Sequence, residues 1–335
     1  MPAQPDIDPL LQPRRQVWSD YWRQGALHSL CGSVASGLDG GIRDFWLQAF
    51  SAVPQQARLL DVCTGNGAIP RLACESAPGR FARVDAIDLA TLAPEWLALA
   101  PEACRQATFF HGGIPAEALP FGPATFDLVT SQFGLEYCST DLAVPELARV
   151  AKPGAGLALV LHHADSRLAD VAREEAGSIQ WLRSTDGPLA AAAAIYPYLA
   201  MAATGQRDRL SADPQAAPAR DRLNAAMHAL VQRSERSAYP DLLFEARDLV
   251  AAHIQGIAQR KLSDAKATAA LDAWAAGLDA AAFRHRELCE HALDASAAAL
   301  LAEACSNAGF DDLALQPLQH EAHLMGWCMT GKRRT

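Results

Sequence analysis

The sequence lacks several features that mark particular classes of protein. Its eight cysteines include no C-x-x-C pair. Eight in 335 residues is ordinary usage, so we expect reduced thiols in a cytoplasm rather than a disulfide framework. Positive charge is also scarce, because 29 basic residues face 38 acidic ones for a net charge of −9. A nucleic-acid partner is therefore not expected, since binding to phosphates normally needs a basic surface.

The chain also lacks a long apolar run. The longest weakly polar stretch, residues 189–203, is mostly alanine and contains Pro197. It is shorter than the ~20 residues that span a bilayer and is expected to be a buried helix. The first residues carry prolines and acids where a secretory signal would need an apolar stretch. We therefore expect a cytoplasmic protein with no membrane partner and, at 50% apolar residues, a sizeable core.

What is present is an alternation of strand-like and helix-like segments. Helix-like stretches separate the strands, which predicts a parallel sheet with helices on both faces. Right-handed crossovers would place the carboxyl ends of the strands at one edge, where ligands bind in such sheets. The apolar runs typical of strands are residues 58–62, 83–88, 108–111, 125–131 and 156–162.

Differences in amino-acid composition along the chain predict three regions. Residues 1–50 are rich in aromatic side chains and are expected to form an N-terminal helical lid. Residues 51–164 and 298–335 would form the core that binds a cofactor. Residues 165–297 show apolar residues at three- and four-residue spacing, which is typical of helices. We expect this insertion to be a helical cap that shapes the pocket, with a dimerisation module as the competing interpretation.

The turn after the first predicted strand carries the most specific chemistry. Gly65 and Gly67 stand between that strand and a helix, so the backbone can turn sharply and approach a ligand closely. Asp88 ends the next strand, where an acid usually accepts the ribose hydroxyls of a nucleoside. The spacing therefore indicates a cofactor that contains adenosine.

Two further residues separate the candidate cofactors. A dinucleotide motif needs a third glycine where this chain has Pro70. Asp61 stands at the mouth of the turn, where a carboxylate would repel a pyrophosphate and attract an ammonium group. The pattern favours S-adenosylmethionine, which carries a sulfonium, an ammonium and a carboxylate.

Taken in order, these motifs resemble those of class I S-adenosylmethionine-dependent methyltransferases. The segment LLDVCTGNGAIP resembles the first motif of that family, with Cys63 in place of its first glycine. Residues 109–137 resemble a segment of the quinone-biosynthesis C-methyltransferases, and residues 146–160 resemble the segment that leads into the fifth strand. The closing helix and terminal strand pair, residues 298–335, complete the likeness. The resemblance implies an α/β fold: a Rossmann-like, doubly wound sheet of seven mostly parallel strands with a terminal antiparallel strand.

The resemblance also implies where the cofactor binds. Gly113 replaces an acid that often holds the adenine amino group, so adenine would depend on the Ile114 backbone amide and on stacking. Tyr21 and His28 lie in the leading segment, which commonly covers the cofactor in such enzymes; aromatic packing onto the core is the alternative. The residues implied to bind S-adenosylmethionine are Tyr21, His28, Asp61, Cys63, Thr64, Gly65, Asn66, Gly67, Asp88, Leu89, Gly113, Ile114, Ser131, Gln132 and Phe133.

Methyl transfer from this cofactor does not require a general base. The leaving group is already activated, and positioning alone can supply roughly 7–11 kcal/mol of barrier reduction. The catalytic candidates are His162, which closes the fifth strand, and Glu136 with Tyr137, which follow the fourth. Packing is the alternative role for His162, and a charge at a helix end is the alternative for Glu136. We expect no metal site, because the closing His-x-x-His pair has no nearby cysteine or row of acids.

These observations lead to one functional hypothesis and one alternative. The hypothesis is transfer of a methyl group from S-adenosylmethionine to a small organic acceptor by in-line displacement in a capped pocket. A (D/N)PP(Y/F) tetrad is absent at Gln132 and Phe133, which disfavours a nucleobase amino group; oxygen, nitrogen and carbon acceptors stay open. The alternative is a catalytically silent or non-methylating S-adenosylmethionine-binding protein whose insertion binds a partner or forms a homodimer.

Overall fold

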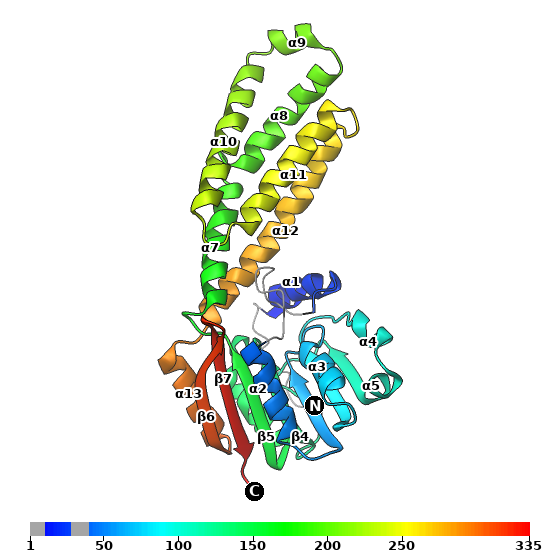
Figure 1. The fold of residues 1–335 in the computed structure, drawn as a ribbon, viewed down its shortest axis with the longest axis vertical. Coiled ribbons are helices and arrows are strands. Elements are labelled where there is room, and N and C mark those ends of the chain that lie inside the picture. Colours follow the sequence, from blue (N-terminus) through cyan, green and yellow to red (C-terminus); the bar gives the residue numbers. More distant parts are fainter. Residues whose placement is uncertain (1–10, 28–39) are drawn as a thin grey trace. The chain divides into compact units, whose positions relative to one another are not determined.

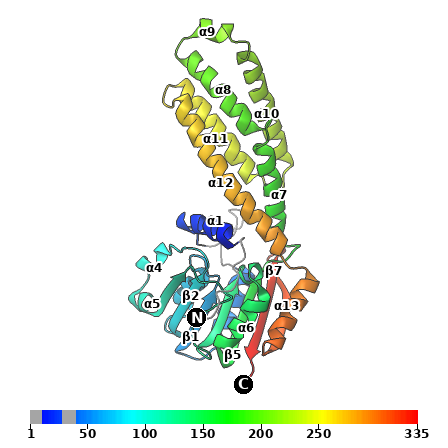
Figure 2. The ribbon, with the colours of Figure 1, turned by 180° about the vertical axis from the view of Figure 1, so that it is seen from behind.

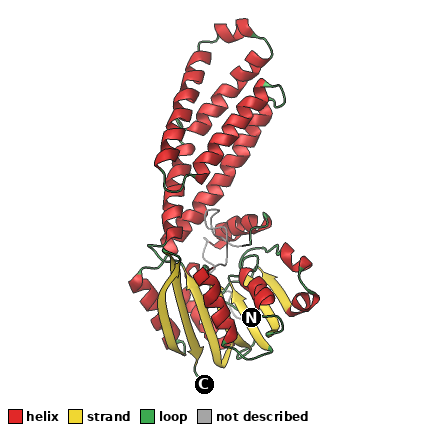
Figure 3. Cartoon of the chain, in the orientation of Figure 1, coloured by secondary structure: helices red, strands yellow, loops and turns green. Residues whose placement is uncertain are grey.

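The computed structural model describes residues 11–27 and 40–335, so His28 lies outside the described residues. The chain divides into two compact units. The first comprises residues 1–170 and 287–335, and the second comprises residues 171–286. The first unit contains the sheet, whereas the second consists of helices (Figure 3).

A seven-stranded sheet forms the centre of the first unit, with the strand order β3-β2-β1-β4-β5-β7-β6. The strands β1 to β5 pair in parallel, and β7 runs antiparallel to both of its neighbours. This arrangement confirms the Rossmann-like, mostly parallel sheet that the sequence predicts. The strands are β1 (Ala57–Val62), β2 (Phe81–Asp88), β3 (Thr108–Gly112), β4 (Phe126–Gln132), β5 (Ala151–Leu161), β6 (Phe310–His320) and β7 (His323–Arg333).

Helices cover both faces of the sheet because successive side chains of its strands point to opposite sides. Leu59 packs in the cluster that contains α2 and α3, whereas Leu60 and Val62 pack in the cluster that contains α6 and α13. Figure 1 shows α2 and α3 across one face, and Figure 2 shows α6 on the other. The helices are α1 (Leu11–Arg23), α2 (Gly40–Ser51), α3 (Ala68–Ser76), α4 (Glu95–Leu99), α5 (Glu102–Ala107), η2 (Leu135–Tyr137), α6 (Thr140–Val150) and α13 (Ala295–Asn307).

The segment predicted to be an N-terminal lid has two different roles. Helix α2 is part of the core, because Trp46 and Phe50 are fully buried among the residues of one sheet face. The Trp46 indole Nε1 also donates a hydrogen bond of 2.6 Å to Oε1 of Gln132, at the end of β4. Of these two helices, α1 is the one that lines the pocket described below. Helices α1 and α2 both carry aromatic residues and are similar in sequence, so only the residues that each helix packs against show their different roles.

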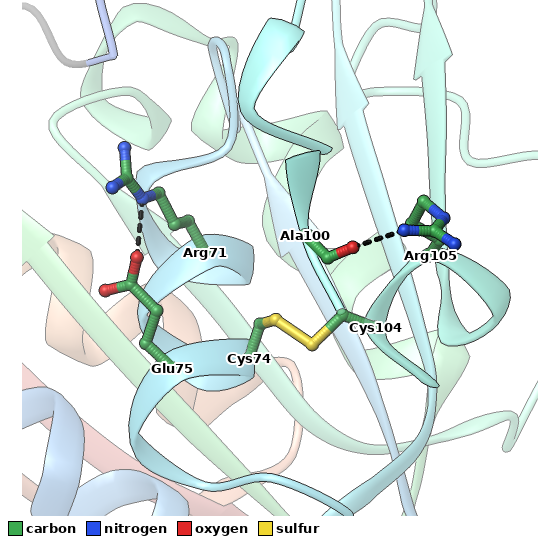
Figure 4. The surroundings of a disulfide bond; sticks show 6 residues. All are labelled: Arg71, Cys74, Glu75, Ala100, Cys104 and Arg105. Atoms are coloured by element: carbon green, nitrogen blue, oxygen red, sulfur yellow. Dashed lines mark hydrogen bonds and ion pairs between the residues drawn. A yellow bond between two sulfur atoms is a disulfide. The ribbon is translucent and has the colours of Figure 1, made fainter. Parts of the chain in front are cut away.

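A disulfide between Cys74 and Cys104 joins α3 to α5 (Figure 4). The expectation of reduced thiols is wrong for this pair, because the fold brings two cysteines that are 30 residues apart to a Cα–Cα distance of 5.8 Å. That distance lies within the usual range for a disulfide. The other cysteines among the described residues, which lie outside this disulfide, are Cys63, Cys138, Cys289, Cys305 and Cys328.

The second unit is built on a core of Leu, Ala, Ile and aromatic side chains from its helices. Inside this core the Tyr196 hydroxyl lies 3.0 Å from Nδ1 of His253, so the buried polar groups of both side chains have a partner. In the part of the chain that the structure describes, no helix is long and apolar enough to cross a membrane. Its helices are α7 (Arg167–Leu182), α8 (Pro188–Ala203), α9 (Arg207–Ala212), α10 (Ala216–Arg236), α11 (Asp241–Ala258) and α12 (Asp264–His291). Helix α7 begins in the first unit, and α12 ends there.

Candidate active site

A pocket with a cavity volume of about 100 Å³ lies where the carboxyl ends of β1, β2 and β4 meet. The parallel register aligns Val62 with Ile87 on one side and with Ser131 on the other, which brings the loops after the three strands together. Of the residues that the sequence implies for the cofactor, those that line this pocket are Asp61, Cys63, Thr64, Gly65, Asp88, Leu89, Ile114, Gln132 and Phe133.

Asp88 is a buried carboxylate held in place by backbone amides. Its Oδ2 accepts a 2.8 Å hydrogen bond from the Gly65 amide, and its Oδ1 accepts one of 2.8 Å from the Ala90 amide. Only 9% of Asp88 is exposed, and this burial raises its pKa to about 6, although the two amides act in the opposite direction. Each oxygen keeps a lone pair for a ligand, because a carboxylate oxygen can accept two hydrogen bonds.

Asp61 is the second buried acid of the pocket. Its Oδ2 accepts a 2.6 Å hydrogen bond from the Thr64 hydroxyl, and its Oδ1 accepts one of 2.7 Å from the Thr130 hydroxyl. Burial raises the pKa of Asp61 to about 7, and the charge of Asp88 adds to this shift. A positively charged ligand beside Asp61 would favour its ionised form, because opposite charges stabilise each other in a poorly solvated site.

The raised pKa of Asp61 predicts a specific effect on stability. Between the unfolded value of 3.8 and the folded value of about 7, the folded protein holds a proton that the unfolded chain has released. Relative to Asp61→Asn, the wild type is therefore expected to lose up to about 1.4 kcal/mol of unfolding free energy per pH unit as the pH rises through this window. Urea unfolding of both proteins across the window measures the difference. Parallel stability curves would contradict the prediction.

The glycine turn also positions α1. The side chain of Asn66 donates hydrogen bonds of 2.8 Å to the Trp22 carbonyl and 2.7 Å to the Ala26 carbonyl, and its oxygen accepts one of 2.9 Å from the Ala93 amide. A Cβ on Gly67 would lie 2.4 Å from the Phe110 ring. Asn66 and Gly67 thus shape the turn and do not line the pocket.

Helix α1 contributes side chains that the sequence did not single out as ligands. Trp18 and Trp22 line the pocket and stack on each other with ring centroids 5.5 Å apart. Tyr21, which was implied to bind the cofactor, packs edge-on against both rings and does not line the pocket. The i,i+4 spacing of the two tryptophans was the available signal, because residues four apart share one face of a helix. A Cβ on Gly65 would lie 2.6 Å from the Trp22 ring, so glycine is needed for this contact.

Arg14 connects α1 to two other elements. Its Nη1 donates a 2.7 Å hydrogen bond to the Tyr137 carbonyl, and its Nε forms an ion pair with Glu287 near the end of α12. Its Nη2 lies 3.1 Å from Nε2 of His291. Arg14 and its neighbour Arg15 both line the pocket, and sequence reasoning missed both of them.

The loop after β3 differs from the expectation for adenine. The Ile114 amide donates a 2.9 Å hydrogen bond to the Asp88 carbonyl, so it is already engaged, while the Ile114 side chain lines the pocket. Gly113 has a positive φ of 77° and lies outside the lining, as does Ser131. Glu117 lines the pocket and accepts a 2.8 Å hydrogen bond from the Ser139 amide with Oε1. The sequence offered a signal for Glu117, since it lies in the segment that resembles the family.

The three catalytic candidates lie together where β4 and β5 end. Tyr137 lines the pocket, and burial raises the pKa of its phenol well above the usual value. His162 contacts two lining rings, since it stacks on Phe133 at 4.4 Å and meets Tyr137 edge-on at 5.9 Å. The backbone amide of His162 donates a 2.7 Å hydrogen bond to Oε1 of Glu136. Neither Glu136 nor His162 lines the pocket itself.

The protonation of these groups follows from burial. Burial raises the pKa of Glu136 to about 7 and lowers the pKa of His162 to about 3. Oε2 of Glu136 and Nδ1 of His162 are buried and have no hydrogen-bond partner among the residues that the structure describes. At neutral pH the imidazole of His162 is therefore uncharged, and Glu136 is present in both its protonated and its ionised form. No group of three or more His, Cys, Asp and Glu side chains within residues 11–27 and 40–335 could hold a metal ion.

The strand order, the glycine turn after β1 and the acid at the end of β2 define a class I S-adenosylmethionine-dependent methyltransferase domain. A family model described as "Methyltransferase domain" matches residues 59–154, and this part of the chain belongs to that family.

Similar proteins include two curated enzymes. The chain is 36% identical over 113 residues to demethylmenaquinone methyltransferase of Bacillus licheniformis, covering 33% of this chain and 47% of that protein. It is 33% identical over 130 residues to 2-phytyl-1,4-naphtoquinone methyltransferase of Thermosynechococcus vestitus, covering 37% and 55%. The chain thus spans about half the length of these relatives. Among solved structures, phosphoethanolamine N-methyltransferase 2 of Haemonchus contortus with S-adenosyl-L-methionine gives a TM-score of 0.34 at 22% identity, over 44% of this chain and 32% of that one.

Proposed function

We propose that the protein binds S-adenosylmethionine in this pocket and transfers its methyl group to a small organic acceptor. The observation that carries the proposal is the buried Asp88 carboxylate, which is fixed by two backbone amides at the end of β2. Two ribose hydroxyls match the lone pairs that it has left. Asp61 matches the ammonium group of the cofactor, and Leu89 and Ile114 offer apolar surface to its adenine.

When bound, S-adenosylmethionine supplies a methyl group that is already activated by its sulfonium. The residues of the chain then bind, orient and exclude water. Trp18 and Trp22 line the pocket from α1 and would keep water from it, while Phe133 and Tyr137 line the side where β4 ends. Glu136 does not line the pocket itself, but with a pKa of about 7 it is the nearby group suited to take up a proton from an acceptor that must lose one.

The acceptor side depends on two further proposals. We infer that the helical second unit acts as a cap and that the acceptor is a small molecule, because methyl donors of this class need a site closed to water. The relatives named above include enzymes that act on quinones, which supports an apolar acceptor with an ionisable oxygen or carbon centre. Dimerisation through the second unit stays the alternative, and a cytoplasmic location is part of the proposal.

Calorimetry with S-adenosylmethionine and its demethylated product tests the binding claim. We expect both ligands to bind, and the absence of binding to either would overturn the proposal. Incorporation of labelled methyl groups into a metabolite extract then distinguishes an enzyme from a silent binding protein. Binding without any labelled product over a wide range of extracts would favour the silent alternative.

A further inference from the structure

Two free thiols face each other in the wall of the pocket. Cys63 follows β1 and Cys138 follows η2, so the two residues are 75 positions apart in the chain. Their Sγ atoms lie 3.6 Å apart. Both side chains are half-buried and line the pocket, which means that a small reagent can reach them from the pocket itself.

The backbone around the two thiols is shaped to keep them together. Cys63 occupies the left-handed region at a φ of 57°, where a side chain is strained. Opposite it stands Gly134, and a Cβ there would lie only 2.3 Å from the Cβ of Cys63. The Sγ of Cys138 also lies 3.6 Å from the Gly134 carbonyl. Glycine at 134 therefore leaves room for the Cys63 side chain, and the same loop holds Cys138 against it.

A disulfide needs its sulfur atoms about 2.05 Å apart, so the observed separation has to shorten by an ångström and a half or so. Both cysteines follow the end of a regular element, where rotation about χ1 and small loop shifts can supply that movement. We propose that Cys63 and Cys138 form a reversible disulfide that reshapes the pocket wall and lowers its affinity for the cofactor. The effect on affinity rests on the proposed function, whereas formation of the bond does not.

The oxidant is a small disulfide such as oxidised glutathione. One protein thiolate attacks its sulfur–sulfur bond, which releases one glutathione and leaves a mixed disulfide on the protein. The second protein thiolate then attacks the protein sulfur and releases the second glutathione. Two protons and two electrons leave the cysteine pair, and the reagent, now two thiols, carries both away.

Peptide mapping tests whether the bond forms. After treatment with oxidised glutathione and alkylation, trypsin should release residues 59–71 and 106–149, each of which contains one cysteine of the pair and no other. We expect these peptides to be cross-linked in the wild type and in Cys289→Ser, which replaces another half-buried cysteine. The cross-link should be absent from Cys138→Ser. Recovery of Cys63 and Cys138 as separately alkylated or glutathionylated peptides overturns the proposal.

Ligand protection and binding test the functional part. S-adenosylhomocysteine, present during oxidation, should slow formation of the cross-link, because it covers the pocket wall. The oxidised wild type should bind this ligand at least about tenfold more weakly than the untreated protein, which is a loss of about 1.4 kcal/mol. The double variant Cys63→Ser/Cys138→Ser has neither thiol of the pair, so treatment with oxidised glutathione should leave its affinity unchanged. An unchanged affinity in the cross-linked wild type overturns the effect on binding. Absence of binding before oxidation overturns the proposed function, while the peptide map still decides whether the bond forms.

Discussion

Replacement of Asp88 by alanine is expected to weaken binding of S-adenosylmethionine by about 100-fold or more. The carboxylate would accept two hydrogen bonds from the ribose, and hydrogen bonds to a charged group contribute about 1.5–3 kcal/mol each. Asp88→Ala also removes the acceptor of the Gly65 amide, which holds the glycine turn in place. Calorimetric titration of the variant with the cofactor measures the loss.

The control for this variant is Asp311→Ala on β6. Asp311 is exposed and pairs with Arg334 at the surface, so its replacement should leave the affinity unchanged. Circular dichroism establishes whether both variants keep the fold. If Asp88→Ala binds the cofactor within about threefold of the wild type, a difference of less than 1 kcal/mol, then Asp88 is not the ribose ligand.

Trp46→Ala should cause the largest loss of stability of any change considered for this chain, about 3–5 kcal/mol. Trp46 is fully buried in the cluster formed by α2, α3 and one sheet face. Its removal leaves a large cavity and deprives Gln132 of the indole donor at 2.6 Å. Since Gln132 also lines the pocket, the loss should extend to cofactor affinity. Urea unfolding monitored by circular dichroism gives the free energy.

Two matched variants separate the causes of this loss. Trp46→Phe keeps most of the buried volume and removes only the hydrogen bond, so we expect a smaller loss of stability than for alanine. Leu99→Ala removes an apolar side chain that is 89% exposed, and its effect should be within about 0.5 kcal/mol of zero. Equal losses for Trp46→Ala and Leu99→Ala would show that the packing of α2 does not stabilise the fold.

The sheet was predictable because each strand carries its own local signal. The apolar runs locate β1 to β5 to within a few residues, and the exception is instructive. Residues 152–155 contain Pro153 and Gly154, which indicate a turn, yet β5 begins at Ala151. The pairing of β4 with β5 shifts register between Phe126, which pairs with Ala151, and Leu128, which pairs with Gly156. Residues 152–155 therefore form an irregularity near the start of β5 and do not end the strand. Such an irregularity depends on the neighbouring strand, so no local pattern reveals it.

The pocket was predictable only where its residues are adjacent to a strand end. Asp61, Gly65 and Asp88 follow from motif spacing, because parallel strands align their carboxyl ends. Trp22 and Arg14 depend on how α1 lies against the rest of the unit, and that contact is set by side-chain hydrogen bonds such as those of Asn66. These bonds join positions about 40 residues apart, beyond the reach of any periodicity.

The Cys74–Cys104 link has a consequence for how the protein should be handled. It closes a ring of chain that includes all of β2, and with it the acid at position 88. Restricting the unfolded chain in this way is worth roughly 3–4 kcal/mol for a ring of this length. That contribution disappears in any buffer that contains a strong reductant. Preparations made with and without dithiothreitol would therefore differ in their resistance to unfolding, although their sequence is the same.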